Sequence, residues 1–331
     1  MTNRLKENTI LIALFAGLAL AVVAAVGVGA VNISFREFID VLLLGKETEH
    51  STILMQIRLP RVLMCLVIGA GLAAVGGVMQ GIFKNPLVDS YTLGMSSGAA
   101  LGAVISIVTG VSFSIAGIST TGVFAFIGAV ATLILVYSLA HKKHKISVNS
   151  LLLAGVAVSY FLSSVIAFMM LLSNDNIQHI VFWTMGSLSL TSWNKVAISY
   201  ITIIPGILVL MLYARELNIL TMGDESAQYL GIDVEKLKRI LLLISCIIVG
   251  SVVSVSGTIG FLGLVAPHIV RLIVGSNNKK VIPYSAILGA ILLILADTLG
   301  RTLIQPVEIP VGVMTSIIGG PFFIFLLRKQ K

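Results

Sequence analysis

Long apolar runs recur along the whole of this 331-residue sequence. A helix that crosses the hydrocarbon core of a bilayer, about 30 Å thick, needs about 20 consecutive apolar residues. Ten runs are candidates, one of which is shorter and broken by glycine and proline; they lie near residues 10–31, 58–81, 91–109, 114–140, 148–172, 193–214, 239–257, 260–275, 281–300 and 307–327. The sequence therefore predicts an all-α polytopic membrane protein with about ten transmembrane helices, forming a single domain over residues 1–331.

The composition excludes an ordinary soluble globule. Hydrophobic residues make up 57% of the chain and charged residues only 11%, whereas soluble domains have about 25% charged residues. So many apolar side chains cannot all lie in one core while the surface stays polar. Membrane lipid is therefore an expected partner, and nucleic acid is not. Cys65 and Cys246 lie inside apolar runs, with no second ligand at metal spacing, so neither a disulfide framework nor a zinc site is expected.

The distribution of cationic residues predicts the orientation. If the amino terminus is inside and all ten runs cross, 16 of the 22 Lys and Arg residues lie on the inner side and 6 on the outer side. Cytoplasmic loops carry the excess of Lys and Arg, so both termini are expected to be cytoplasmic. Arg4 and Lys6 precede the first run as in a signal peptide, but no clean small-residue cleavage site follows, so a retained first helix is expected.

Small residues are expected to mediate the packing of the helices, because lipid provides no hydrophobic drive for their association. Gly94, Gly98 and Gly102 share one helical face at i, i+4 and i+8. A further pattern is that Gly76 and Pro86 have the same spacing as Gly257 and Pro267. Matched Gly- and Pro-containing segments in two halves are typical of inverted repeats in transporters; chance coincidence is the alternative.

The polar stretch of about residues 214–238 is the longest expected inner segment. Asp224 is placed to cap a short helix that Gly231 would end, leaving Ala227 and Leu230 as an apolar edge in water. Such an edge indicates a docking surface for a cytoplasmic protein, and a solvated linker is the alternative. The chain has no phosphate-binding G-x-x-x-x-G-K-[ST] motif, so ATP, if it drives this protein, must bind another subunit.

Few ionisable residues lie inside the apolar runs. Asp297 and Arg301 are spaced i, i+4 and are expected to form an ion pair. No run carries the series of acidic or histidine residues that a proton-coupled transporter usually needs. His141 and His144 have metal-ligand spacing, but the lysines beside them oppose a bound cation, so a positive inner loop is the better interpretation.

Three of the six outer cations are expected at the mouths of helices. Arg58 and Arg61 flank Pro60 at the start of the second run, and Arg301 lies at the outer end of the ninth. Guanidinium groups there can pair bidentately with carboxylates of a ligand or partner. Anchoring of lipid headgroups is the alternative.

Several motifs in series resemble the FecCD-type permeases of ABC transporters for iron chelates and cobalamin. The motifs are residues 57–61 (IRLPR), 76–81 (GGVMQG), 85–89 (NPLVD), 93–103 (LGMSSGAALGA), 260–272 (GFLGLVAPHIVRL), 310–312 (PVG) and 319–321 (GGP), together with Asp297 and Arg301. The resemblance covers about residues 10–330. It implies the type II importer fold of the cobalamin permeases and a location in a bacterial or archaeal cell membrane.

The family resemblance also implies partners. A homodimer, or a heterodimer with a related permease, would enclose the path at its interface. Two cytoplasmic ATPase subunits would bind ATP and Mg, and an extracytoplasmic protein would bring the substrate. This chain would hold no cofactor and no metal and would catalyse no reaction.

Individual residues take roles only through this resemblance. It implies ATPase coupling by Asp224, Glu225, Ser226, Ala227, Gln228, Leu230 and Gly231. Docking of the binding protein falls to Arg58, Arg61 and Arg301, and the inner gate to Asn85, Leu87, Val148 and Asn149. Val148 and Asn149 depart from the small hydroxyl residues of the cobalamin relative.

The function expected from the sequence is therefore that of the permease of an ATP-driven importer for an iron chelate, either a ferric siderophore or haem. Import of cobalamin is the alternative within the family, with molybdate a distant third. A secondary transporter or channel without ATP is the alternative from another class.

Overall fold

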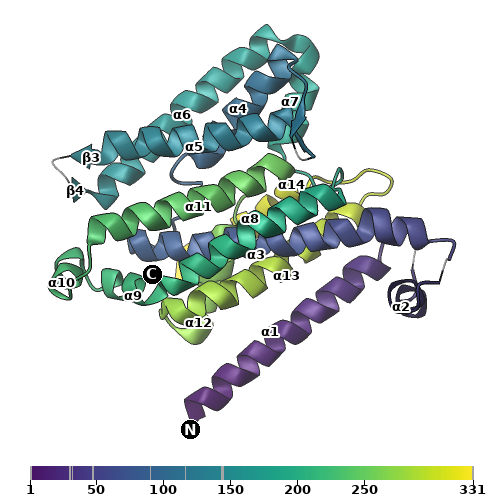
Figure 1. Cartoon of the computed structure of the whole chain (residues 1–331), viewed down its shortest axis with the longest axis horizontal. Helices are drawn as coiled ribbons and strands as arrows, with labels where there is room; N and C mark the ends of the chain where they lie inside the picture. Colours follow the sequence, from purple (N-terminus) through teal and green to yellow (C-terminus); the bar gives the residue numbers. More distant parts are fainter. Residues whose placement is uncertain are drawn as a thin grey trace.

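The computed structural model describes residues 2–29, 31, 33–46, 48–89, 91–115, 117–142 and 145–329 and is almost entirely helical (Figure 1). Ten helices match the ten apolar runs: α1 (Thr2–Gly27), α3 (Leu59–Phe83), α4 (Met95–Thr109), α5 (Thr120–Ala140), α6 (Val148–Leu172), α8 (Trp193–Leu212), α11 (Val234–Ser256), α12 (Leu262–Val274), α13 (Asn278–Thr302) and α14 (Val311–Lys329). Within the described residues, seven helical spans are long and apolar enough to cross a membrane, whereas α4, α12 and the part of α14 up to Phe325 are shorter. The predicted all-α polytopic fold is confirmed.

Shorter elements link these helices. They are α2 (Phe35–Leu44), the π-helical η1 (Ile53–Arg58), the 3-10 turn η2 (Asn174–Asn176), α7 (Ile177–Thr184), α9 (Ala214–Thr221), α10 (Asp224–Tyr229) and two antiparallel hairpins, β1 (Ser114–Ile115) with β2 (Ile118–Ser119) and β3 (His141–Lys142) with β4 (Lys145–Ile146). The apolar periodicity did not indicate α2 or α7, because ten and eight residues are too few to stand out as spans.

The predicted start of the fourth run, at residue 114, was wrong. Ser114–Ile115 and Ile118–Ser119 instead form the hairpin β1–β2, and Gly117 adopts a left-handed φ of 84° that suits a tight turn. Helix α5 then begins at Thr120, and the Ser119 side chain accepts a hydrogen bond from the backbone N–H of Gly122. A helix cap therefore sets this boundary, although apolar residues precede it.

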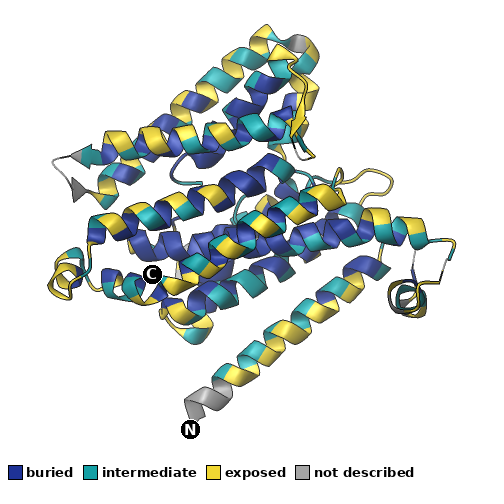
Figure 2. Cartoon of the chain, viewed as in Figure 1, coloured by how far each residue is buried: buried dark blue, intermediate teal, exposed yellow. Residues whose placement is uncertain are grey.

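Helix α3 lies at the centre of the bundle and packs against α8, α11, α12 and α13 (Figures 1 and 2). In the most apolar 18-residue window of the span Ile53–Phe83, which joins η1 to α3, 89% of the residues are buried. A Cβ at Gly76 would collide with the carbonyl oxygen of Gly263 in α12, and one at Gly69 would collide with that of Gly289 in α13. Backbones can approach this closely only where side chains are absent, so the expected packing through small residues is confirmed.

The glycine face of α4 packs as expected. A side chain at Gly98 would meet Thr132 and Gly128 of α5, and one at Gly102 would meet the backbone of Phe124. In Figure 1, α4, α5, α6 and α7 form a group on one side of α11, and α3 and α13 lie on its other side. The chain is thus a central bundle around α3 with a second group of helices laid against it.

The two glycine–proline pairs occupy different local structures. Gly76 lies inside α3 and Pro86 follows that helix, whereas Gly257 adopts a left-handed φ of 67° after α11 and Pro267 lies inside α12. Their shared spacing therefore does not mark equivalent positions. The inverted repeat stays a prediction.

The peripheral helices carry many exposed residues (Figure 2), and a number of these are large and apolar. Helix α6 exposes Leu153, Tyr160, Phe161, Phe168 and Leu171, and α1 has only 17% of its apolar window buried. Water would penalise such surfaces, whereas lipid or a second subunit would stabilise them.

Candidate functional site

Charged groups gather at the two ends of α3. Arg58 and Arg61 mark its beginning, and Lys84 follows its last residue. At about 1.5 Å per residue, a helix of this length holds the two ends about 37 Å apart, which is enough to span a bilayer core. Each end contains one aspartate between two cations, described in turn below.

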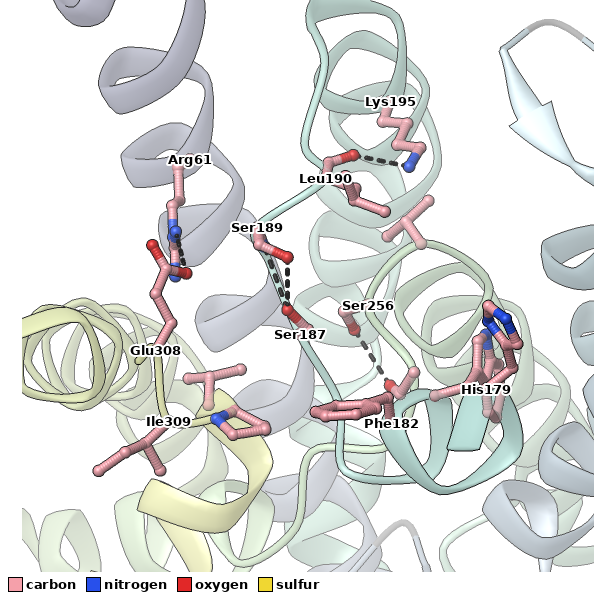
Figure 3. A pocket seen from close by; sticks show the side chains of 15 residues that line it. Arg61, His179, Phe182, Ser187, Ser189, Leu190, Lys195, Ser256, Glu308 and Ile309 are labelled. Atoms are coloured by element: carbon pink, nitrogen blue, oxygen red, sulfur yellow. Dashed lines mark hydrogen bonds and ion pairs between the residues drawn. The ribbon is translucent and has the colours of Figure 1, made fainter. Parts of the chain in front are cut away.

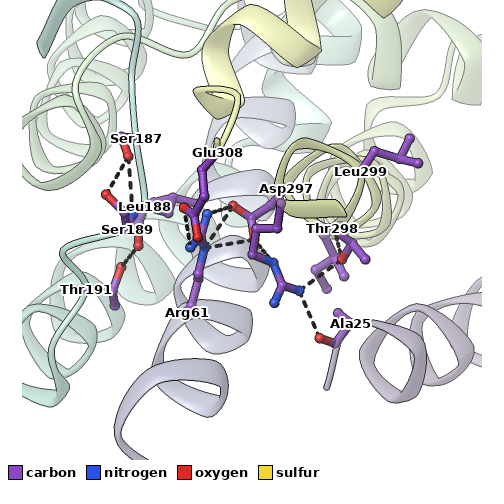
Figure 4. Close-up of polar contacts among 12 residues, drawn as sticks. Ala25, Arg61, Ser187, Leu188, Ser189, Thr191, Asp297, Thr298, Leu299 and Glu308 are labelled. Carbon is purple, nitrogen blue, oxygen red and sulfur yellow. Dashed lines mark hydrogen bonds and ion pairs between the residues drawn. The ribbon is translucent and has the colours of Figure 1, made fainter. Parts of the chain in front are cut away.

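The first network centres on Asp297, whose side chain is 2% exposed (Figure 4). The Arg61 guanidinium donates from Nε to both carboxylate oxygens at 3.0 Å, and Arg301 Nε lies 3.3 Å from Asp297 Oδ2. Arg61 also donates from Nη1 to Glu308 Oε2 at 2.9 Å. The expected ion pair of Asp297 with Arg301 is confirmed, and Arg61 extends it into a network of two cations and two anions.

Sequence spacing did not reveal the partners of Arg61. Asp297 lies 236 positions further along the chain and Glu308 lies 247 positions further. The ion pairs join the beginning of α3 to the end of α13 and to the segment before α14. Buried charges must be paired and hydrogen-bonded to be tolerated, so this network fastens three segments of the bundle.

Arg58 and Arg301 also hold the end of α1. Arg58 donates from Nη1 to the carbonyl oxygens of Val26, at 2.6 Å, and Gly27, at 3.1 Å, and from Nη2 to that of Val31. Arg301 donates from Nη2 to the carbonyl oxygen of Ala25 at 2.9 Å. Carbonyls at a helix C-terminus lack partners within the helix and carry partial negative charge, so two cations are well placed there.

The three predicted docking arginines are brought together. Arg58, Arg61 and Arg301 line one pocket of about 320 Å³, with Glu308 at its edge. The side chains of Arg61 and Arg301 are each only 8% exposed, and the Glu308 side chain is 47% exposed. The predicted cluster therefore lies just below the surface, and each of its three arginines already donates hydrogen bonds inside the chain.

A second pocket, of about 420 Å³, adjoins the same network (Figure 3). Arg61 and Glu308 line one side, and His179, Phe182 and Lys195 are among the other lining residues. Lys195 Nζ donates to the carbonyl oxygen of Leu190 at 2.7 Å. The sequence did not indicate the α7 residues of this pocket, because that helix is short.

The second network lies at the other end of α3 and centres on Asp224, the first residue of α10. Lys84 Nζ donates to Asp224 Oδ1 at 3.2 Å and Lys238 Nζ donates to Oδ2 at 2.6 Å. The Lys238 side chain is fully buried, whereas those of Lys84 and Asp224 are 37% and 42% exposed. Burial raises the pKa of Asp224, but hydrogen bonds and charge from Lys238 and Lys84 outweigh it and hold that pKa below its ordinary value.

Two expectations for α10 were wrong. Asp224 does not cap the helix; Gly223 occupies the N-cap position with φ 137°, and the Asp224 carboxylate points to the two lysines. Ala227 is not exposed but fully buried. The exposed apolar side chains are those of Met222, Tyr229 and Leu230. The position of Gly231 was correct, since it adopts φ 82° directly after Leu230, the C-cap residue.

The residues expected to form the inner gate lie beside this network. A pocket of about 590 Å³ is lined by Val148 and Asn149 at the start of α6, by Phe83 and Lys84, and by residues 222–226. Asn85 and Leu87 follow Lys84, and the Asn85 side-chain oxygen accepts a hydrogen bond from the backbone N–H of Leu87 at 2.9 Å. The gate and coupling residues therefore form one neighbourhood.

No group of three or more His, Cys, Asp and Glu side chains within the described residues could hold a metal ion. The ring of His141 stacks on that of Tyr137 at 5.9 Å between centroids. His144 lies outside the residues that the structure describes.

Long apolar helices packed through glycine, with charged networks at both ends of a central helix, define a multi-pass membrane protein with the architecture of a transport permease. The chain belongs to the FecCD transport family, whose model matches residues 9–329. It is thus a transport protein and not an enzyme, and the family resemblance seen in its motifs is confirmed.

Relatives match nearly the whole chain. The hemin transport system permease of Yersinia pestis is 38% identical over 335 residues, covering 100% of this chain and 98% of the relative. The cobalamin import system permease of Halobacterium salinarum is 41% identical over 275 residues, covering 83% and 73% of the two chains. A solved structure described as an inward-facing conformation of a candidate metal-chelate-type ABC transporter matches with a TM-score of 0.86 and 31% identity, covering 97% of this chain and 99% of that one.

Proposed function

We propose that this chain is the membrane permease of an ATP-driven importer for an iron chelate, either a ferric siderophore or haem. The observation that carries the proposal is the end-to-end match to a hemin permease, which leaves no part of the chain unaccounted for. The fold similarity to a metal-chelate-type ABC transporter supports it. The chain moves its cargo and performs no chemistry on it, and selectivity lies mainly with the protein that delivers the chelate.

The working assembly in this proposal has two permease copies, two cytoplasmic ATPase subunits that hold ATP and Mg, and a substrate-binding protein outside. A second permease copy, or a related permease in a heterodimer, would cover exposed apolar faces such as that of α6. Both termini face the cytoplasm of a bacterial or archaeal cell. The excess of Lys and Arg on the proposed inner side supports this orientation.

The ATPase subunits bind at α10 and its flanks, residues Asp224 to Gly231. In support, Tyr229 is 91% exposed and Leu230 is 64% exposed, although both are large and carry apolar surface. Ala227 is buried beneath them and holds α10 against the bundle. Large apolar side chains on a rigid short helix are typical anchors in protein interfaces.

The binding protein docks at the pocket that contains Arg58, Arg61 and Arg301, through carboxylates on its two lobes. Glu308 already pairs with Arg61 and is half exposed, so a partner's carboxylate would replace an internal one. This exchange keeps Arg61 compensated in both states, because Asp297 stays in place. Asn85, Leu87, Val148 and Asn149 form the inner gate at the opposite end.

Cobalamin is the second candidate cargo, and the 41% identity to a cobalamin permease favours it. That match covers less of this chain than the match to the hemin permease does. The resemblance implies small hydroxyl residues in cobalamin permeases where this chain has Val148 and Asn149, and this departure also favours the iron chelate.

Deletion of the gene in its host, followed by uptake of labelled ferric siderophores, haem and cobalamin under iron limitation, tests the proposal. Loss of uptake of a ferric siderophore or haem alone is the expected result. Loss of cobalamin uptake alone would assign the second cargo to the same fold. Uptake that survives removal of the co-purifying ATPase would contradict an ATP-driven importer and support a secondary transporter.

A further inference from the structure

One side chain of the short helix α10 forms ion pairs with residues of two long helical segments. Asp224 accepts from Lys84 at the end of α3 and from Lys238 in α11. We propose that Lys84, Asp224 and Lys238 form a charge latch that passes movement of α10 to the inner gate. This inference rests on the proposed function, in which the ATPase binds α10, and it adds the positioning residues that connect that binding to the gate.

The residues of α10 that can bind the ATPase and the residue that pairs with the lysines lie at opposite ends of the helix. Tyr229 and Leu230 are exposed at the end of the helix, whereas the Asp224 carboxylate at its beginning points to the two lysines of the bundle. An ATPase subunit can therefore contact the exposed side chains without touching the latch. A displacement of α10 necessarily displaces the Asp224 carboxylate, because Asp224 is its first residue.

The two arms of the latch differ in strength. Lys238 is fully buried and its Nζ lies 2.6 Å from Asp224, whereas Lys84 is 37% exposed and its Nζ lies 3.2 Å from the same carboxylate. The Lys238 ammonium is shielded from water although Asp224 is partly exposed, so water screens its contact less than that of Lys84. The Lys238 arm is therefore the lasting attachment, and the Lys84 arm is the one that can open and close.

Lys84 is well placed to move the gate. It ends α3 with a left-handed φ of 49°, an uncommon conformation for a residue with a side chain. Asn85 comes next, and its side chain organises the turn that carries Leu87. The pocket of about 590 Å³ between Lys84, residues 222–226 and the start of α6 leaves room for the lysine to change its position.

The test follows the gate directly, without knowledge of the cargo. Leu87→Cys places a thiol at the gate, where the native side chain is 37% exposed, and the two native cysteines are buried. The importer, with its ATPase and binding protein, is reconstituted in liposomes, and the rate of labelling by a membrane-impermeant maleimide is measured with and without MgATP. Lys84→Gln is then added; it leaves Asp224 with Lys238 and creates no buried unpaired charge.

We expect MgATP to change the labelling rate when Lys84 is present and to lose that effect with Lys84→Gln, while the ATPase stays bound. Lys84→Arg keeps the charge and should restore the response. Lys280→Gln is the matched control, because Lys280 makes a similarly half-exposed ion pair with Glu7; it should leave the response intact.

Two outcomes overturn the latch and are distinguishable. If Lys84→Gln responds to MgATP as fully as the parent does, the latch is wrong and the proposed function stands. If the parent itself shows no response and the ATPase does not co-purify, the proposed function fails and the latch fails with it.

Discussion

The charged networks at the two ends of α3 have a similar arrangement but differ in how far they are buried. Each end places one aspartate between two cations: Asp297 between Arg61 and Arg301, and Asp224 between Lys84 and Lys238. Asp297 is almost completely buried, whereas Asp224 is 42% exposed. A buried pair is costly to break and an exposed one is not, so the first network suits a permanent fastening and the second suits a joint.

Removing the Asp297 carboxylate should have the largest effect, a loss of stability of the folded protein. Asp297→Ala leaves Arg61 and Arg301 close together and short of negative charge, and breaking a buried pair costs about 3–5 kcal/mol. We expect a large fall in the midpoint of thermal unfolding of the purified protein in detergent. Asp224→Ala should cause a smaller fall, because its carboxylate is half exposed and only one of its two partners, Lys238, is buried, whereas both cations beside Asp297 are buried. Equal shifts would show that the two networks do not differ as described.

Changing the exposed end of α10 should abolish binding of the ATPase without unfolding the permease. Tyr229→Asp with Leu230→Asp places charges on two exposed side chains, and anchor residues of interfaces contribute about 2 kcal/mol or more each. Co-purification of the ATPase should be lost while the unfolding midpoint stays unchanged. Leu190→Asp is the control that should keep the ATPase, because Leu190 is also exposed but lies beside the Arg61 network. Stoichiometric binding in the double variant would refute the assigned role of α10.

A single substitution tests whether the three arginines bind the substrate-binding protein. Glu308→Gln removes the half-exposed partner of Arg61 and keeps Asp297, so the pocket gains positive charge. An exposed pair contributes about 0.2–1 kcal/mol, and docking of the binding protein should therefore tighten up to about fivefold. The gain should be greatest at low ionic strength, because salt screens exposed charges. Weaker docking at low salt would count against the arginines as the docking site.

The smallest expected effect concerns the stability that the Asp224 network contributes and how this contribution depends on pH. The pKa of Asp224 is held below its ordinary value of 3.8 in the folded protein, so its ionised form is favoured by folding. That contribution is complete above the pKa of the unfolded chain and is lost as the pH falls through the folded-state value. The stability difference between the parent and Asp224→Asn should therefore be constant from about pH 7 to about pH 5 and shrink in more acidic solution. A difference that grows with acid would have the wrong sign.

Much of the fold could be predicted because its signals are local. Hydrophobic runs, the glycine face of α4 and the i, i+4 pair of Asp297 and Arg301 each depend on residues close together in the chain. A predicted helix boundary was wrong where a different local pattern determined the structure. Before Thr120, a turn at Gly117 and the Ser119 cap lie where the helix was expected to start.

The candidate sites were only partly predictable. Arg58, Arg61 and Arg301 were expected at one end and do share a pocket. Apart from the Asp297–Arg301 pair, their internal partners were not predicted, because Glu308 and the carbonyls at the end of α1 carry no sequence pattern that points to an arginine. On α10 the expected inward and outward residues were misassigned, since a helix of six residues has no periodicity from which to identify its buried face.

The sequence by itself determined that this chain is a membrane protein, how many apolar segments it has and to which family it belongs. Hydrophobicity and motifs are properties of contiguous residues, so they can be read without the structure. Only the tertiary structure decided that Arg61 pairs with Asp297 and Glu308, that Lys238 lies buried against Asp224, and that Ala227 faces inward. Charges find partners by proximity in space. Distance along the chain therefore says little about which of them a folded protein brings together.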